Sequence, residues 1–163
     1  MKATKVYYTF IDCDDSIETL KRVSEYLYDK GLVKETYVES LLKREKEFPT
    51  GLQSEKGVGV AIPHADIEHV LEEAFVAIFP TKTLHFHKMD EPDKEIPVDL
   101  VLLLVVKSTQ GYMKFLSDLA STINDEKFAE LVESRKTEEI IDFLIKNILK
   151  KHFKVEQVER VKL

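Results

Sequence analysis

The sequence has 163 residues, about the length of one domain and enough to bury a hydrophobic core. Its 44% hydrophobic and 33% charged residues are ordinary for a globular protein, and no apolar run reaches the ~20 residues that a membrane-spanning helix needs. The net charge of −6 argues against nucleic acid as a partner, because binding to the phosphate backbone depends on clustered Lys and Arg.

The start of the sequence and its cysteine content bear on the cellular compartment. The first residues contain no uninterrupted apolar segment and no small-residue cleavage site, so we expect no signal peptide. Cys13 is the single cysteine and cannot form an internal disulfide. Its neighbours Asp14 and Asp15 disfavour a thiolate, which predicts a small buried residue rather than a nucleophile. We therefore expect a cytoplasmic protein.

The N-terminal half alternates between strand and helix patterns. Asp15 followed by Glu18 resembles a helix capping box, and Gly31 is a natural stop for the helix that begins there. In chain order we expect a strand (5–12), a helix up to Gly31, a second helix that ends before Pro49, a loop (51–59) and a short strand (58–62).

The C-terminal half contains the most apolar segment of the chain, residues 100–106 (LVLLLVV). A run this short without alternation predicts a strand that helices cover on both faces. The other expected elements are strands at 75–79 and 83–87, a polar connection at 88–95, and three helices whose apolar positions fall within 112–123, 128–132 and 140–148.

These elements predict an α/β fold with one mixed β-sheet flanked by helices on both faces. We expect a single domain over residues 1–150. Residues 151–163 alternate basic, acidic and apolar types, and this tail is compatible with helix, strand or disorder. The fold alone does not identify a function.

The segment 44–64, REKEFPTGLQSEKGVGVAIPH, carries the candidate chemistry. A short apolar strand leads to His64 directly after Pro63, whose ring restricts the backbone and so sets the direction of the imidazole. With an ordinary pKa near ~6.5, much of such a histidine is neutral and nucleophilic at cellular pH. It can attack phosphorus and later release the group. A structural or surface histidine is the alternative that this pattern leaves open.

The motifs REKEFPTGL and VAIPHAD together resemble the active-site region of the fructose–mannitol class of IIA components in the bacterial sugar phosphotransferase system. Within that class the galactitol type is the most similar. The resemblance continues through FPTKTLHF and PVDLVLLLVV and covers residues 5–147. It implies the same mixed sheet with flanking helices.

The resemblance implies a phosphocarrier. His64 would take phosphate on Nε2 from the histidine phosphocarrier protein and pass it to a cysteine of a IIB partner, without a cofactor or metal. The sugar, galactitol or a related one, would bind the membrane IIC component, so contact with the membrane is indirect. A regulatory IIA-like module, which binds targets according to its phosphorylation state, is the alternative.

Three further residues are candidates for the site. Arg44 matches an arginine of the mannitol type and could hold phosphate, or it could pair with Glu45 or Glu47 at the helix end. Thr50 could place a hydroxyl near the imidazole or be a turn residue. His85 could support His64, since the galactitol type has a similar HF pair, or lie on an exposed hairpin.

Two positions depart from the mannitol pattern. Tyr112 stands where those proteins have a second active-site histidine, and Val58 stands where they have a glutamate. The galactitol type also lacks that second histidine, so a one-histidine mechanism is expected. A zinc site built from His85, His87 and His64 or His69 is disfavoured, because no pair has the helical i, i+4 spacing and no cysteine joins them.

Overall fold

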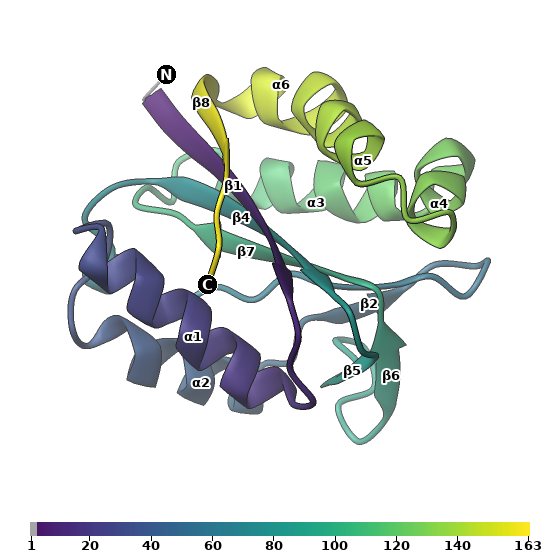
Figure 1. Ribbon diagram of the computed structural model, residues 1–163, viewed down its shortest axis with the longest axis horizontal. Helices are drawn as coiled ribbons and strands as arrows, with labels where there is room; N and C mark the ends of the chain where they lie inside the picture. The colour runs from purple at the N-terminus through teal and green to yellow at the C-terminus, as the bar shows by residue number, and fades with distance from the viewer. Residues whose placement is uncertain (1–2) are drawn as a thin grey trace.

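The computed structural model describes residues 3–163 and is built around a six-stranded mixed sheet (Figure 1). The sheet order is β2-β3-β7-β4-β1-β8, and a separate hairpin pairs β5 with β6. The strands are β1 (Ala3–Ile11), β2 (Gly51–Gln53), β3 (Gly59–Ala61), β4 (Ala74–Pro80), β5 (Leu84–His87), β6 (Glu95–Val98), β7 (Leu100–Val105) and β8 (Lys154–Arg160).

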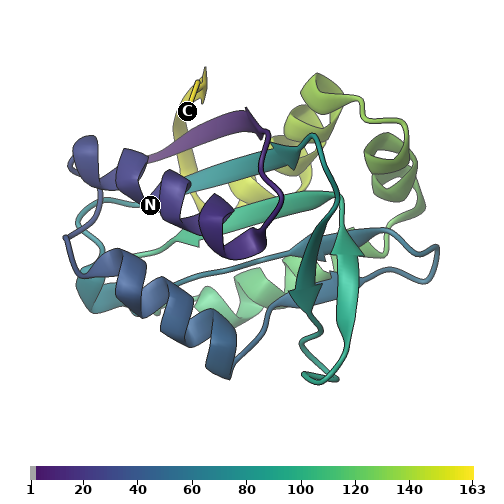
Figure 2. The same cartoon turned by 60° about the horizontal axis from the view of Figure 1, so that its bottom comes forward.

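Helices cover both faces of this sheet (Figure 2). The helices α1 (Ser16–Asp29) and α2 (Tyr37–Glu47) lie on one face. The other face carries α3 (Tyr112–Ile123), α4 (Glu126–Glu133), α5 (Thr137–Leu144), the π-helical turn η2 (Ile145–Leu149) and α6 (Lys150–His152). A 3-10 turn, η1 (Ile67–His69), follows β3. The predicted α/β fold with a mixed sheet is confirmed.

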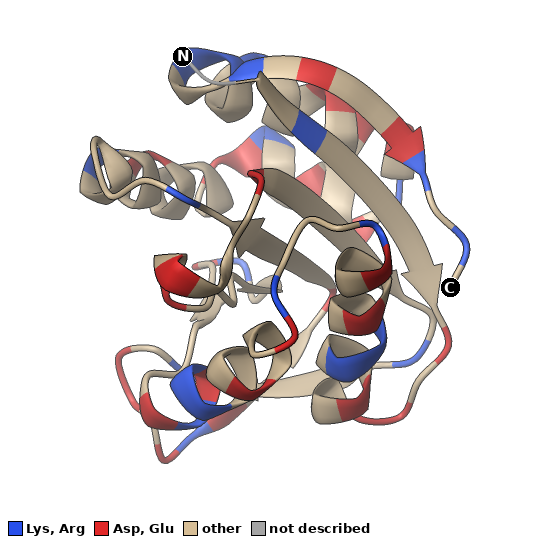
Figure 3. Ribbon diagram, turned by 90° about the vertical axis from the view of Figure 1, so that its left-hand side faces the viewer, with Lys and Arg blue, Asp and Glu red and all other residues tan. Residues whose placement is uncertain are grey.

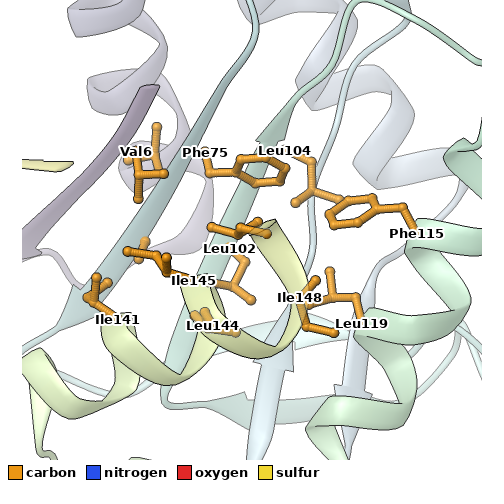
Figure 4. Close-up of a pocket in the computed structure, with 13 residues that line it drawn as sticks. Val6, Phe75, Leu102, Leu104, Phe115, Leu119, Ile141, Leu144, Ile145 and Ile148 are labelled. Atoms are coloured by element: carbon orange, nitrogen blue, oxygen red, sulfur yellow. The ribbon is translucent and has the colours of Figure 1, made fainter. Parts of the chain in front are cut away.

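The sheet divides the hydrophobic core into two layers because successive residues of a strand point to opposite faces. All six residues of β7 are buried, as its unbroken apolar sequence predicts. The layer under α3 and α5 contains a small apolar cavity of about 20 Å³, which includes Phe75, Leu102 and Phe115 in its lining (Figure 4). No helix in the described range 3–163 has the length and hydropathy to span a membrane.

The predicted helix boundaries have the expected local chemistry. The Asp15 carboxylate accepts hydrogen bonds from the amides of Ile17 (2.7 Å) and Glu18 (3.4 Å) at the start of α1. Gly31 adopts a φ of 75° just after that helix, a conformation that costs glycine little. Asp125 caps α4 in the same way, through the amide of Phe128 at 3.1 Å.

The structure differs from the sequence-based expectations in two segments and decides between the alternatives for a third, the C-terminal tail. The loop expected over 51–59 begins with β2, which pairs antiparallel with β3. The polar connection ends one residue early, because β6 begins at Glu95. Residues 154–160 of the tail form β8 and pair parallel with β1. The partner of β8 is distant in sequence, which a local pattern does not report, whereas β2 and β6 each pair within a hairpin.

One close contact explains a glycine near the candidate site. A Cβ on Gly59 would lie 1.9 Å from the carbonyl oxygen of Pro97, so only glycine lets β6 approach β3 this closely. The strand that leads to His64, β3, pairs with β2 on one side and β7 on the other, and β6 approaches it closely at Gly59.

Candidate active site

His64 lies just beyond β3, where the chain still runs beside β7. The amide of Leu104 donates to the carbonyl of Pro63 at 3.0 Å, and His64 itself forms an isolated parallel bridge with Leu104. The backbone on both sides of the imidazole is therefore fixed by the central sheet. The predicted strand–proline–histidine arrangement is present, with the side chain half-buried.

The imidazole is oriented by its own backbone. Nδ1 of His64 lies 3.0 Å from the carbonyl oxygen of Ile62. A carbonyl oxygen can only accept, so Nδ1 carries the proton in the neutral ring and Nε2 keeps its lone pair. This bond selects the nitrogen that is free to react.

The surroundings of His64 favour its neutral form. Burial lowers the pKa of His64 below its ordinary value, and the positive charge of Arg44 lowers it further. The hydrogen bond to Ile62 and the negative charge of Asp66 act in the opposite direction without reversing the shift. The ring is thus predominantly neutral at pH 7.

Arg44 comes from the last turns of α2 and reaches the loop after His64. Its Nη1 lies 3.1 Å from Oδ1 of Asp66, rather than on Glu45 or Glu47. Its guanidinium also lies over the Phe48 ring, 5.6 Å from the centroid. The Nε atom is buried without a hydrogen-bond partner in the described part of the chain, so one donor remains unused beside the site.

Two tyrosines lie beside His64 and Arg44. The Tyr112 ring, at the first residue of α3, contacts the His64 ring edge to face, with centroids 5.7 Å apart. Tyr37 is fully buried, and it shares one face of α2 with Arg44 seven residues later. Burial raises the pKa of both tyrosines, and neither hydroxyl has a partner within residues 3–163. The site therefore has buried, unused hydrogen-bonding capacity from both α2 and α3.

Thr50 is bound to α2 by Glu45. The Glu45 carboxylate accepts from the Thr50 amide at 2.9 Å and from its hydroxyl at 2.7 Å. The Thr50 carbonyl accepts from the Ile62 amide at 3.3 Å, which links this loop to the strand that leads to His64. Burial raises the pKa of Glu45 to about 7, although both bonds from Thr50 lower it. The Thr50 hydroxyl is thus engaged with Glu45.

His85 and His87 share the exposed face of β5, as their spacing predicts. His87 donates from Nδ1 to the carbonyl of Pro92 at 2.8 Å, and its Nε2 lies 3.4 Å from Glu95. Across the described range 3–163, no hydrogen bond, ion pair or ring contact joins His85 to His64. The structure places His85 on the exposed hairpin and leaves its supporting role a prediction.

The remaining candidates are the single cysteine and a possible group of metal-binding side chains around η1. Cys13 is buried, and its thiol lies 3.6 Å from the carbonyl of Asp15. Three potential metal-binding atoms, from Asp66, Glu68 and His69, gather within 4.8 Å of one another around η1. Asp66 is already paired with Arg44, and His69 Nδ1 lies 2.7 Å from the Thr36 hydroxyl, so these groups have partners in the chain itself.

Sequence reasoning missed two contributors, Asp66 and Glu45. Asp66 is not among the candidates from the sequence, and Glu45 appears there only as a possible partner of Arg44. A usable signal for Asp66 is its position two residues after His64 in PHAD, which keeps it in reach of the same cation. No local signal distinguishes Glu45 from the other acidic residues of α2, because its bond to Thr50 depends on the turn after the helix.

Comparison with known proteins agrees with this geometry. The family model described as "Phosphoenolpyruvate-dependent sugar phosphotransferase system, EIIA 2" matches residues 3–148. The galactitol-specific EIIA component of Escherichia coli strain K12 is 30% identical over 135 residues, which cover 83% of this chain and 89% of that protein. These similarities confirm the resemblance that the two sequence motifs indicate.

Solved structures of low sequence identity share the fold. The Escherichia coli complex of enzyme IIAMTL with phosphorylated enzyme IIBMTL includes a chain similar at a TM-score of 0.65 and 20% identity, over 86% of this chain and 94% of that one. The IIA mannitol structure from Escherichia coli matches at a TM-score of 0.63 and 22% identity, over 85% and 94%. With the family model spanning nearly the whole chain, the protein belongs to the EIIA 2 family of the phosphoenolpyruvate-dependent sugar phosphotransferase system.

Proposed function

We propose that this chain accepts a phosphoryl group on Nε2 of His64 and passes it to a cysteine of a IIB component. The observation that carries the proposal is the 3.0 Å contact between Nδ1 of His64 and the Ile62 carbonyl. It holds the proton on Nδ1 and leaves the Nε2 lone pair available for attack. The lowered pKa of His64 keeps this neutral form populated at cellular pH.

The transfer is a pair of in-line displacements. Nε2 of His64 attacks the phosphorus of the phosphorylated histidine phosphocarrier protein, and the donor's N–P bond breaks with its electron pair returning to the donor imidazole. A thiolate of the IIB component then attacks the same phosphorus, and His64 recovers its lone pair. The ring bears positive charge during each step, which the Ile62 carbonyl stabilises through Nδ1. Positioning and charge stabilisation supply the catalysis, without a cofactor.

Arg44 is the proposed partner of the phosphoryl oxygens. Its guanidinium is near enough to lower the pKa of His64, and its unused Nε donor is buried at the site. Asp66 holds the guanidinium in the unphosphorylated state. Thr50 acts by fixing the connection between α2 and β2 through Glu45, and His85 remains a supporting candidate from the resemblance alone.

The partners would dock on an apolar rim around His64. Phe48 is 62% exposed and packs on Arg44, while Met113 is 76% exposed and follows Tyr112. Ile67, next to Asp66, adds a third exposed apolar side chain. A protein partner seated on these side chains would exclude water from the phosphorus during transfer.

The galactitol-specific relatives support galactitol or a related sugar as the transported substrate. The sugar itself would bind a membrane IIC component, with which this chain would communicate only through IIB. The setting of such a relay for this chain would be the cytoplasm.

Phosphorylation with purified components tests the proposal. The chain is incubated with phosphoenolpyruvate, the phosphocarrier kinase and the phosphocarrier protein, and its intact mass is measured. We expect one phosphate that is labile in acid and stable in base, and none on His64→Ala. His69→Gln is the matched control and should be phosphorylated normally. Full phosphorylation of His64→Ala would refute the assignment, and failure to pass the phosphate to any IIB cysteine would favour the regulatory alternative.

A further inference from the structure

The C-terminal strand β8 is an addition to the part of the chain that the family model matches. That match ends at residue 148, whereas β8 spans Lys154–Arg160. The strand lies beside β1 at one edge of the sheet (Figure 1). No strand of the described chain pairs with its outer side. An unpaired edge of this length presents backbone donors and acceptors to any strand that can match it.

The backbone direction of β8 identifies which groups are free. The amide of Val161 donates to the carbonyl of Tyr8 at 2.8 Å. The backbone N–H and C=O groups of the odd-numbered residues near the end of β8 therefore point toward β1. Successive peptide groups of a strand point alternately to its two edges. The amides and carbonyls of Val158 and Arg160 therefore point away from the sheet.

We propose that two copies of this chain associate through antiparallel pairing of their β8 strands, with Val158 opposite Val158. In this register Glu156 of each copy lies opposite Arg160 of the other, which forms two ion pairs related by the twofold axis. The free peptide groups of Val158 and Arg160 are those that such an antiparallel pair would join. The result would be a continuous sheet across both copies.

The charges of β8 favour this register over its neighbours. If the twofold axis passed through Gln157 instead of Val158, Lys154 of one copy would lie opposite Arg160 of the other. If it passed through Glu159, the two Glu159 carboxylates would face each other. Along β8, the two acidic residues Glu156 and Glu159 lie between the basic residues Lys154 and Arg160 (Figure 3). The like-charged pair in the proposed register, Lys154 with Lys162, falls at the solvent-exposed ends, where screening is strongest.

The side-chain environment also fits a second strand. Val158 is 44% exposed although it is apolar, and pairing would cover it with its own copy. An open hollow lies beside β8, with Asp142 and Lys146 on its helical wall and Glu156 and Val158 on its strand wall. This space can receive side chains of the incoming strand. His64 follows β3, near the opposite edge of the sheet, so pairing leaves it accessible.

Sedimentation equilibrium of the full chain over a range of concentrations tests the proposal. We expect a concentration-dependent mass approaching twice 18.9 kDa. Val158→Pro should be monomeric, because proline removes an outward amide and adds a clash at the pairing edge while sparing the bonds to β1. Circular dichroism checks that this variant keeps its fold.

Charge reversal tests the register and serves as a second route should Val158→Pro fail to fold. Glu156→Arg alone and Arg160→Glu alone should each weaken self-association at least about tenfold, because like charges then face each other. Mixing the two single variants should restore the dimer as a heterodimer, since each arginine meets a glutamate. A monomeric native chain at all concentrations, or a dimer indifferent to all of these changes, would overturn the proposal.

Discussion

At the scale of single residues, Arg44 combines an ion pair to Asp66 with an unused Nε donor beside His64. Arg44→Lys keeps the charge but loses the planar fork that binds two phosphoryl oxygens. We expect it to slow phosphoryl transfer to a IIB cysteine by about tenfold or more, while the free energy of unfolding changes by less than about 1 kcal/mol. Rapid-quench transfer rates and urea unfolding measure the two effects. Lys43→Arg, an exposed neighbour, is the control, and an unchanged rate in Arg44→Lys would assign Arg44 a structural role.

The roles of Tyr112 and His85 in supporting His64 can be distinguished by a matched pair of substitutions. Tyr112→Phe keeps the ring contact with His64 and removes a buried hydroxyl that has no partner in the described residues. We expect unfolding stability to be unchanged or slightly raised, and the transfer rate to fall by at most about tenfold. His85→Gln should reduce the rate by as much or more if His85 supports His64. A hundredfold loss in Tyr112→Phe with no effect of His85→Gln would transfer the supporting role to Tyr112.

At the scale of elements, Glu45 connects α2 to the residue just before β2, Thr50. Its folded pKa of about 7 lies above the ordinary 4.5, so the folded protein holds this proton more tightly than the unfolded chain. The contribution of Glu45 to stability is therefore complete below pH 4.5 and is lost as pH rises through about 7. Gln at this position can accept from the Thr50 amide and donate to its hydroxyl, as the protonated acid does.

We therefore expect Glu45→Gln to flatten the decline in unfolding free energy between pH 5 and 8 by on the order of 1–2 kcal/mol. Urea unfolding at several pH values measures the slope. Glu47→Gln changes an exposed carboxylate of the same helix and should leave the slope unaltered. Parallel profiles for the native chain and Glu45→Gln would show that the carboxylate does not titrate in this window.

At the scale of the whole molecule, the C-terminal tail and the candidate site at His64 lie at different parts of the sheet. Phe153 packs against Phe75 and Phe115, with centroids 4.9 and 5.1 Å apart, and Val161 is buried. Removing residues 151–163 should cost at least about 2 kcal/mol of stability while His64 is still phosphorylated. Thermal unfolding and intact mass measure both. Removing only the exposed residues 162–163 is the control, and loss of phosphorylation in a folded truncation would contradict this separation.

The sequence by itself determined the alternation of elements, the buried β7 and the helix caps, because these depend on residues close together in the chain. It also predicted His64 as the phosphate acceptor, through a proline-restricted strand end and two motifs that resemble a known family. The partner of Arg44, the engagement of Thr50 with Glu45 and the exposed position of His85 were decided by the tertiary structure. So was β8, because a segment this rich in charged residues becomes a strand only where β1 offers it hydrogen bonds. Local chemistry thus specifies which groups can react, whereas long-range packing specifies which of them meet.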